Sequence, residues 1–343
     1  MTLLPCHRPP TGSKAQWRPC MLALLHVSLA EAGLRSAQPR GEASDSVRND
    51  SVPYFVLAAM ATVPPRFSVL PAAVQDMFSQ QTTPPDRLLV IMALSYRHFP
   101  IEVAQVRGTA ERLQAAHTKC RCHVLERDHG PISKIVGALH HLREQAEDLR
   151  RRTLLVTVDD DLVYPRWLLE NLVLWARHYP ITAHAGGTYR GVTQRQLTVY
   201  GPYPGETIRG ARGTFPVGRL LECAARRVNY LYGWGGVAYG PGVPESLGLL
   251  EHLEWLNGSC WSCDDQYISG HAISRGVPIY VISFPRGKGV AWTLRGQLPR
   301  AARPNASKAL SSTLQQAMVN MLLRFKLKTW LEVPHLDSID RSR

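Results

Sequence analysis

Short apolar runs, separated by stretches with the period of a helix, constrain the fold of this chain more than any other feature. The runs cover residues 54–60, 87–94 and 153–158, with a shorter strand candidate over 121–125. Continuous apolar runs of this length are typical of strands buried on both faces, and their alternation with amphipathic helices is the pattern of a parallel sheet. The sequence therefore predicts an α/β fold, with a mostly parallel sheet and helices on both of its faces.

The remaining elements follow from the same periodicities in both halves of the chain. Apolar residues recur at helical spacing after the first strand, and again between and after the later ones. The expected helices cover residues 67–77, 132–150, 165–178, 244–257, 264–275 and 307–331, and a further strand covers 277–283. We expect a single domain over 52–305, followed by a C-terminal helix and tail over 306–343.

The first 51 residues have the layout of a targeting signal followed by a linker. Basic residues precede the apolar stretch 21–30, and small and then polar residues follow it, which is the order found in secretory signal peptides. Acceptor sequons for N-glycosylation begin at Asn49, Asn257 and Asn305, and they agree with a secretory route. We therefore expect a glycoprotein of the secretory pathway that resides in the Golgi lumen.

The chain is basic, with 40 lysines and arginines against 27 aspartates and glutamates and a net charge of +13. The basic residues are scattered, and no basic block is interleaved with aromatic residues as a single-strand nucleic-acid surface requires. The composition therefore favours an anionic small molecule over a nucleic acid as partner. No apolar run reaches the roughly 18 residues that cross a bilayer as a helix, so we expect no transmembrane span, while membrane association stays open.

Three consecutive aspartates, Asp159, Asp160 and Asp161, directly follow the strand expected over 153–158. In open α/β sheets, ligands bind beyond the carboxyl ends of the strands, so chemistry is expected here. Neighbouring carboxylates repel one another, and a hard divalent cation offsets that repulsion while it takes its other ligands from phosphate and water. The structural alternative is an acidic loop that caps the next helix.

This motif resembles the Asp-x-Asp motif of the GT-A glycosyltransferases, in which carboxylates hold the metal ion that bridges the diphosphate of a nucleotide sugar. The resemblance covers residues 52–283. Upstream, residues 128–134 look like the Gly-Pro-x-x-Lys segment of eukaryotic, protist-like members, and downstream residues 233–236 and 263–266 look like an acceptor-side glycine loop and a late acidic motif. It implies a GT-A fold and a hexosyltransferase that moves a sugar from a nucleotide-sugar donor, a UDP-sugar, to an acceptor hydroxyl of a glycan, protein or lipid.

On the donor side, the resemblance assigns Asp159 and Asp161 to a metal ion, Mn²⁺ or Mg²⁺. Similar enzymes often supply a late histidine as third ligand, but none can be identified here, since His335 lies far into the tail.

The expected contacts to the nucleotide sugar come from Thr62, Arg66, Lys134 and Asp160. Lys134 begins a predicted helix, where an ammonium group can meet a diphosphate by charge together with the helix N-terminus. Its alternative is a solvated surface lysine. Thr62 and Arg66 follow the first strand, as the nucleotide-contacting turn does in similar enzymes, and a plain loop is the alternative.

On the acceptor side, Trp234, Gly235 and Gly236 are expected to bind the acceptor. The glycines allow close approach of the backbone to a sugar, and the indole offers a stacking face; a tight turn beside a core tryptophan is the alternative. Asp264 and Asp265 precede a helical pattern, so either is a candidate general base for the acceptor hydroxyl or a helix cap. We favour Asp265 as the base.

Two other classes of protein compete with this interpretation. Asp159 and Asp161 also fit the signature of a haloacid-dehalogenase-like phosphatase, in which the first aspartate is a nucleophile. That nucleophile usually follows the first strand of its domain, whereas three strand candidates precede it here. A non-catalytic nucleotide-sugar-binding protein on the same fold is the second alternative, and it predicts the loss of a metal carboxylate or of the late acid. Neither is lost.

Overall fold

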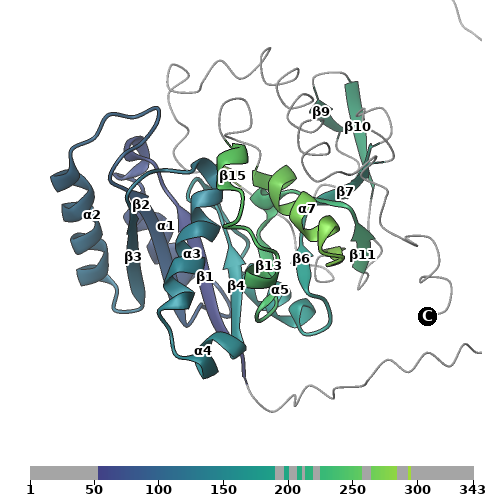
Figure 1. The fold of residues 1–343 in the computed structure, drawn as a ribbon, viewed down its shortest axis with the longest axis horizontal. Helices are drawn as coiled ribbons and strands as arrows, with labels where there is room; N and C mark the ends of the chain where they lie inside the picture. Colours follow the sequence, from purple (N-terminus) through teal and green to yellow (C-terminus); the bar gives the residue numbers. More distant parts are fainter. Residues whose placement is uncertain are drawn as a thin grey trace, which may run out of the picture. The chain divides into compact units, whose positions relative to one another are not determined.

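The computed structural model describes residues 53–189, 197–200, 207–210, 213–218, 225–256, 264–283 and 293–294 (Figure 1). The chain divides into two compact units, residues 1–48 and 49–343, and all described residues belong to the second. Several sequence predictions lie outside the described residues, including the targeting segment, the three sequons, the terminal helix and His335.

The strands predicted in the first half are present and form parallel neighbours. They are β1 (Phe55–Ala61), β2 (Arg87–Ala93), β3 (Cys120–Leu125) and β4 (Thr153–Thr157). β1 pairs in parallel with both β2 and β4, and β2 pairs in parallel with β3. The side chains of β4 are buried along its whole length, as are the central residues of β1. This burial explains why β1 is an unbroken apolar run and why β4 has only threonines beside its apolar residues.

The second half of the chain extends the same sheet with shorter strands. These are β6 (Ile181–Ala183), β11 (Ala225–Val228), β13 (Val237–Tyr239) and β14 (Ile279–Ile282). The described sheet has eight strands in the order β11-β14-β6-β13-β4-β1-β2-β3. β13 is antiparallel to β4 and β6, and β11 is antiparallel to β14, whereas the other neighbours are parallel. The predicted mostly parallel α/β fold is confirmed.

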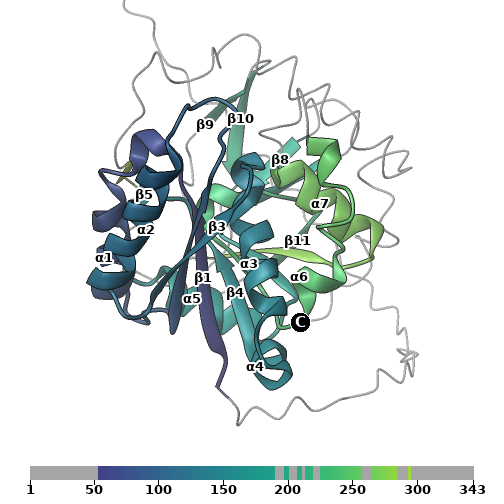
Figure 2. The ribbon, with the colours of Figure 1, turned by 60° about the vertical axis from the view of Figure 1, so that its left-hand side comes forward.

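Helices cover both faces of this sheet. Figure 2 shows α1 (Leu70–Ser79) and α2 (Val103–Ala116) on one side of strands β1 to β3, and α3 (Ser133–Arg143) on the other. α5 (Leu168–Ala176) packs against β4, β6 and β13, and Gln81, just beyond α1, donates to the carbonyl of Pro165 near its start. α7 (Asp264–Ser274) confirms the helix predicted over 264–275.

Short strands and turns make up the other described elements. A second sheet has the order β12 (Tyr230–Leu231), β7 (Gly186–Tyr189), β8 (Leu197–Tyr200), β10 (Gly213–Gly218) and β9 (Thr207–Gly210). β5 (Leu162–Val163) pairs with β15 (Thr293–Leu294). The 3-10 turns are η1 (Pro64–Arg66), η2 (Gly130–Ile132), η4 (Gly233–Gly235) and η5 (Leu253–Leu256).

Two predicted helices are wrong in extent. The helix expected over 132–150 is broken into α3 and α4 (Glu147–Arg152), because Ala146 is extended and starts a new helix with its own acidic first turn and basic last turn. The helix expected over 244–257 is only the short α6 (Val243–Ser246), because Gly248 adopts a φ of 66° that ends it. Across the described residues, we find no helix long and apolar enough to cross a membrane.

Candidate active site

Polar side chains gather at the edge of the sheet where the four parallel strands end. Thr62 follows β1, Asp128 follows β3 and Asp159 follows β4. β13 runs antiparallel to β4 with Val237 opposite Thr157, so the glycine turn of residues 233–236 reaches the same edge. The order β3-β2-β1-β4 reverses between β1 and β4, which is where ligands bind in open sheets of this kind.

Arg66 joins the two strands at this reversal. Its Nη1 lies 2.6 Å from Oδ1 of Asp160, and its Nη2 lies 2.7 Å from Oδ2 of Asp161. Asp160 is buried, and burial raises its pKa to about 6 although the Arg66 guanidinium lowers it. Asp161 stays partly exposed. The turn after the first strand therefore contacts the acidic motif directly, while Thr62 is buried beneath it.

Lys134 lies between the acidic motif and α7. Its Nζ is 2.7 Å from Oδ1 of Asp159 and 3.6 Å from Oδ2 of Asp264. Burial alone would lower the pKa of Lys134, but the carboxylates of Asp159 and Asp264 raise it above its ordinary value, so the ammonium is kept. The surface-lysine alternative is wrong, because the first turn of α3 is buried.

The two late aspartates occupy the first turn of α7. Asp264 is buried, and Oδ1 of Asp265 accepts a hydrogen bond of 2.8 Å from the backbone N–H of Gly233. Burial raises the pKa of both carboxyl groups, and their mutual repulsion raises that of Asp265 further. A Cβ atom on Gly233 would lie 2.9 Å from Oδ1 of Asp265 and 3.6 Å from Nζ of Lys134. The bare backbone at Gly233 therefore makes room for these charged groups.

Gly235 and Gly236 serve a different purpose from the one expected. A Cβ atom on Gly235 would meet Ala185, and one on Gly236 would meet Leu168 of α5, in both cases at less than 3.4 Å. Gly236 also has a φ of 79°, which side-chain-bearing residues rarely adopt. These two glycines form the tight, packed turn that was the alternative to an open sugar contact.

His184 was not predicted from the sequence, and it forms a hydrogen bond with this turn. Its Nδ1 lies 3.2 Å from the carbonyl oxygen of Gly235, and its Nε2 lies 2.8 Å from Nδ2 of Asn171. A carbonyl only accepts and an amide NH2 only donates, so the partners assign a neutral ring with the proton on Nδ1. Burial lowers the pKa of His184 to about 3, consistent with that neutral ring.

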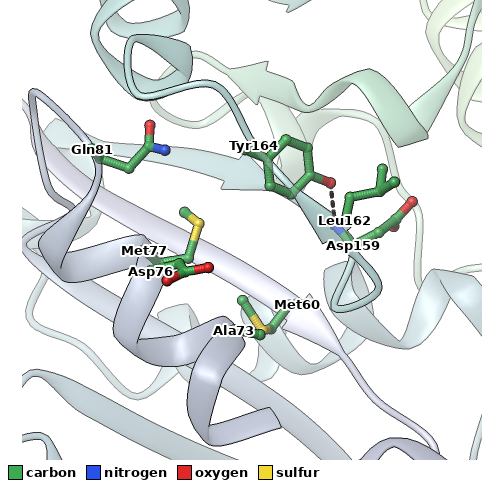
Figure 3. A pocket seen from close by; sticks show the side chains of 8 residues that line it. All are labelled: Met60, Ala73, Asp76, Met77, Gln81, Asp159, Leu162 and Tyr164. Carbon is green, nitrogen blue, oxygen red and sulfur yellow. Dashed lines mark hydrogen bonds between the residues drawn. The ribbon is translucent and has the colours of Figure 1, made fainter. Parts of the chain in front are cut away.

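Two tyrosines that sequence reasoning also missed fix the loops around the site. The hydroxyl of Tyr96 accepts from the N–H of Ala93 and donates to the carbonyl of Thr62, which joins the ends of β2 and β1. The hydroxyl of Tyr164 accepts from the N–H of Asp159 (Figure 3). Buried phenol hydroxyls need such partners. Because the partners here are backbone groups, no sequence motif predicts them.

The residues of the acidic motif fit a divalent cation that shares its ligands with a substrate. Within the described part of the chain, no group of three or more His, Cys, Asp or Glu side chains is arranged to hold a metal ion. Asp159 and Asp161 are each partly exposed, and two carboxylates are what Mg²⁺ or Mn²⁺ takes from a protein when phosphate oxygens and water complete its shell.

Comparisons with known proteins give structural neighbours only, since neither a family model nor a curated protein matches the chain. One neighbour is GalNAc-T7 with UDP, GalNAc and Mn²⁺, at 13% identity and a TM-score of 0.47 over 68% of this chain. This chain spans 43% of that structure's length. Another is the mannosyltransferase PcManGT from Pyrobaculum calidifontis in complex with GDP-Man and Mn²⁺, at 13% identity and a TM-score of 0.39, covering 80% of this chain and 74% of that one.

Proposed function

We propose that this chain is a metal-dependent glycosyltransferase of the GT-A type, which moves a sugar from a UDP-sugar or similar nucleotide sugar to an acceptor hydroxyl. The observation that carries the proposal is the placement of Lys134. One buried ammonium group contacts both a carboxylate of the acidic motif, at 2.7 Å, and a carboxylate at the start of α7, at 3.6 Å. Residues suited to hold a diphosphate and residues suited to take a proton are therefore immediate neighbours.

On the donor side, Asp159 and Asp161 would hold Mn²⁺ or Mg²⁺, which when bound offsets the charge of the diphosphate. Arg66 supplies a guanidinium beside the same two-strand junction, where it can turn from the carboxylates toward phosphate oxygens. Lys134 holds Asp159 in place by its ion pair. Thr62 and Asp160 are buried, and Asp160 holds Arg66 by its ion pair of 2.6 Å.

On the acceptor side, Asp265 would take the proton of the acceptor hydroxyl as the acceptor oxygen bonds to the anomeric carbon and the bond from that carbon to the diphosphate breaks. Burial raises its pKa above the ordinary value of an aspartate, and a general base works best when its pKa is raised toward the working pH. The Gly233 N–H bond at 2.8 Å fixes one oxygen of Asp265, and the other oxygen would take the proton. Trp234 is partly exposed on this side and offers a stacking face.

The phosphatase alternative is disfavoured by the position of Asp159. The acidic motif follows the fourth strand of the domain, since β1, β2 and β3 precede it. Asp159 is also held by Lys134 at 2.7 Å, an arrangement that lowers its power as a nucleophile. The discriminating observation is hydrolysis of a generic phosphate ester, which the phosphatase alternative requires and the proposed function does not.

The metal requirement is tested with the variant Asp161→Asn and with a chelator. We expect the variant to lose nucleotide-sugar transfer while its circular dichroism and thermal midpoint stay close to wild type, because Asp161 is partly exposed. Chelator-treated wild type should lose the Mn²⁺-dependent rise in thermal midpoint with UDP-sugars and GDP-mannose. Asp148→Asn removes the same charge from an exposed site on α4 and is the control. Equal binding and transfer after chelation would show that the metal role is wrong.

A further inference from the structure

Tyr164 lies at the junction of the acidic motif and the glycine turn. Its hydroxyl accepts a hydrogen bond of 2.6 Å from the backbone N–H of Asp159 and donates one of 3.4 Å to the carbonyl of Trp234. The side chain is buried, and both partners are backbone groups. In Figure 3 the hydroxyl points to the start of the Asp159 loop, away from Met77 and Gln81 on the far wall of the adjoining hollow.

These two bonds complete a ring of contacts around the site. From Tyr164 the ring passes to Trp234 and its neighbour Gly233, whose N–H binds Asp265 at the start of α7. In the other direction it passes to Asp159 and through Lys134 to Asp264, the first residue of the same helix. We call the acidic motif, Asp159 to Asp161, the donor loop and the glycine turn of residues 233–236 the acceptor turn, after their proposed roles. The two are joined twice, once through charged side chains and once through the Tyr164 hydroxyl.

The geometry of this hydroxyl sets it apart from a packing tyrosine. A hydroxyl has one proton and two lone pairs, so it can donate to one carbonyl and accept from one amide at the same time. Phenylalanine would fill the same space and break both connections at once. The backbone N–H of Asp159 would then lose this partner inside the protein, where an unmade hydrogen bond is costly.

We propose that Tyr164 is a positioning residue that couples the donor loop to the acceptor turn. Ligand binding at Asp159 and Asp161 is transmitted through its hydroxyl to the Trp234 backbone, which orders the turn that holds Asp265. The inference rests on the proposed function, because it assigns the two loops to donor and acceptor. Beyond that function, it links ligand binding at the donor loop to the order of the acceptor turn.

The test compares Tyr164→Phe with Tyr267→Phe by hydrogen exchange and nucleotide binding. Tyr267 is the matched control, since it is a buried tyrosine of α7 whose hydroxyl donates to the carbonyl of Leu249, a residue of neither loop. Each protein is measured alone and with Mn²⁺ plus UDP or GDP as probes. Amide exchange is followed by mass spectrometry in peptides covering residues 158–163 and 231–237.

We expect both variants to lower the thermal midpoint slightly, because each loses buried hydrogen bonding of one phenol. Only Tyr164→Phe should speed exchange in both peptides and weaken UDP binding by about fivefold to tenfold. In wild type and Tyr267→Phe, nucleotide should slow exchange in residues 231–237, and in Tyr164→Phe this protection should disappear.

Two results would overturn the inference, and they differ in what else they affect. Nucleotide-induced protection of residues 231–237 that persists in Tyr164→Phe overturns the coupling and leaves the proposed function standing. Wild-type protein that binds neither UDP nor GDP with Mn²⁺ overturns the proposed function, and the role of Tyr164 falls with it.

Discussion

At the scale of single residues, the site has fewer cationic side chains than carboxyl groups. Among the described residues, Arg66 and Lys134 form ion pairs with Asp159, Asp160, Asp161 and Asp264. Burial raises the pKa of Asp160, Asp161 and Asp264 in spite of these pairs. A bound cation would add the missing positive charge. This excess of carboxyl groups over cationic side chains supports the proposed metal site.

The late aspartates give the sharpest prediction at this scale. Asp265→Asn should cut turnover by roughly 10² to 10⁴ while nucleotide-sugar affinity stays close to wild type, because proton abstraction matters in the transition state and little in donor binding. Asparagine can still accept the Gly233 N–H through its carbonyl oxygen, so the turn should keep its place. Turnover and donor affinity are measured by steady-state kinetics and calorimetry.

The neighbour Asp264 provides the comparison. Its carboxylate faces Lys134 at 3.6 Å, so Asp264→Asn should disturb the ammonium and weaken donor binding as well as turnover. Unchanged turnover in Asp265→Asn would remove Asp265 from the chemistry, and Asp264→Asn would then decide whether its neighbour is the general base.

The sequence predicted the charged members of the site but not the groups that hold them. Asp159 and Asp161 stood out because three carboxylates follow an apolar run, and Lys134 because it starts a helix. Tyr164, Tyr96 and His184 were missed, since each acts through backbone groups that only the folded chain brings near. The open sugar contact expected at Gly235 and Gly236 is wrong, because a sequence does not show that the missing Cβ atoms of these two glycines face packed side chains.

At the scale of elements, the long and strongly periodic segments were predicted correctly from the sequence. Predictions of helix ends failed where the backbone conformation of a single residue determines the end. The strands at the centre of the sheet follow from their continuous apolar runs. α2 was missed because only four of its residues are buried, Val106, Thr109, Ala110 and Leu113, in a mostly polar segment. The breaks at Ala146 and Gly248 depend on single φ and ψ values, which apolar periodicity does not record.

The contact between α3 and β2 gives a prediction about an element pair. A Cβ atom on Gly137 would lie 2.4 Å from Cγ1 of Ile91, so the helix approaches the sheet closely at this glycine. Gly137→Ala should therefore reduce the free energy of unfolding by about 1 to 3 kcal/mol through overpacking. It should also weaken donor binding, because the same helix carries Lys134. Urea denaturation and nucleotide calorimetry measure the two effects.

Gly108→Ala is the matched control for this prediction. Gly108 is in α2, and the nearest atom to its added Cβ is the flexible end of Arg112 at 3.4 Å. Alanine should stabilise this helix by about 0.5 to 1 kcal/mol. If Gly137→Ala stabilises the protein as Gly108→Ala does, the close approach of α3 to the sheet is refuted.

At the scale of the whole molecule, buried neutral histidines link the fold to pH. His184 joins α5 to the glycine turn through Asn171 and Gly235, and His271 of α7 lies 2.9 Å from the carbonyl of Leu247. Burial lowers the pKa of His184 to about 3 and that of His271 to about 4. These two rings therefore take up a proton at a lower pH in the folded protein than in the unfolded chain.

The sign of the pH effect follows from which state binds the proton. An unfolded histidine takes up a proton near pH 6.5, whereas folded His184 does so only near pH 3. Between these values the unfolded state binds more protons, so the stability that neutral His184 contributes is present above pH 6.5 and lost as the pH falls toward 3. The buried aspartates with raised pKa values act in the opposite direction, so the overall pH profile is a sum of both.

The contribution of His184 is isolated by comparison with His184→Asn, which cannot titrate. Wild type should be the more stable protein at pH 7, and its advantage in free energy of unfolding should shrink by up to about 1.4 kcal/mol per pH unit as the pH falls below 6.5. Urea denaturation at pH 7, 6 and 5 measures this difference while the aspartate contributions cancel. His178→Asn removes an exposed imidazole and should leave the profile of wild type unchanged. An advantage of wild type over His184→Asn that is constant across these pH values would mean that His184 takes up its proton at the same pH in the folded and the unfolded protein. The neutral ring assigned to the support of the glycine turn would then be wrong.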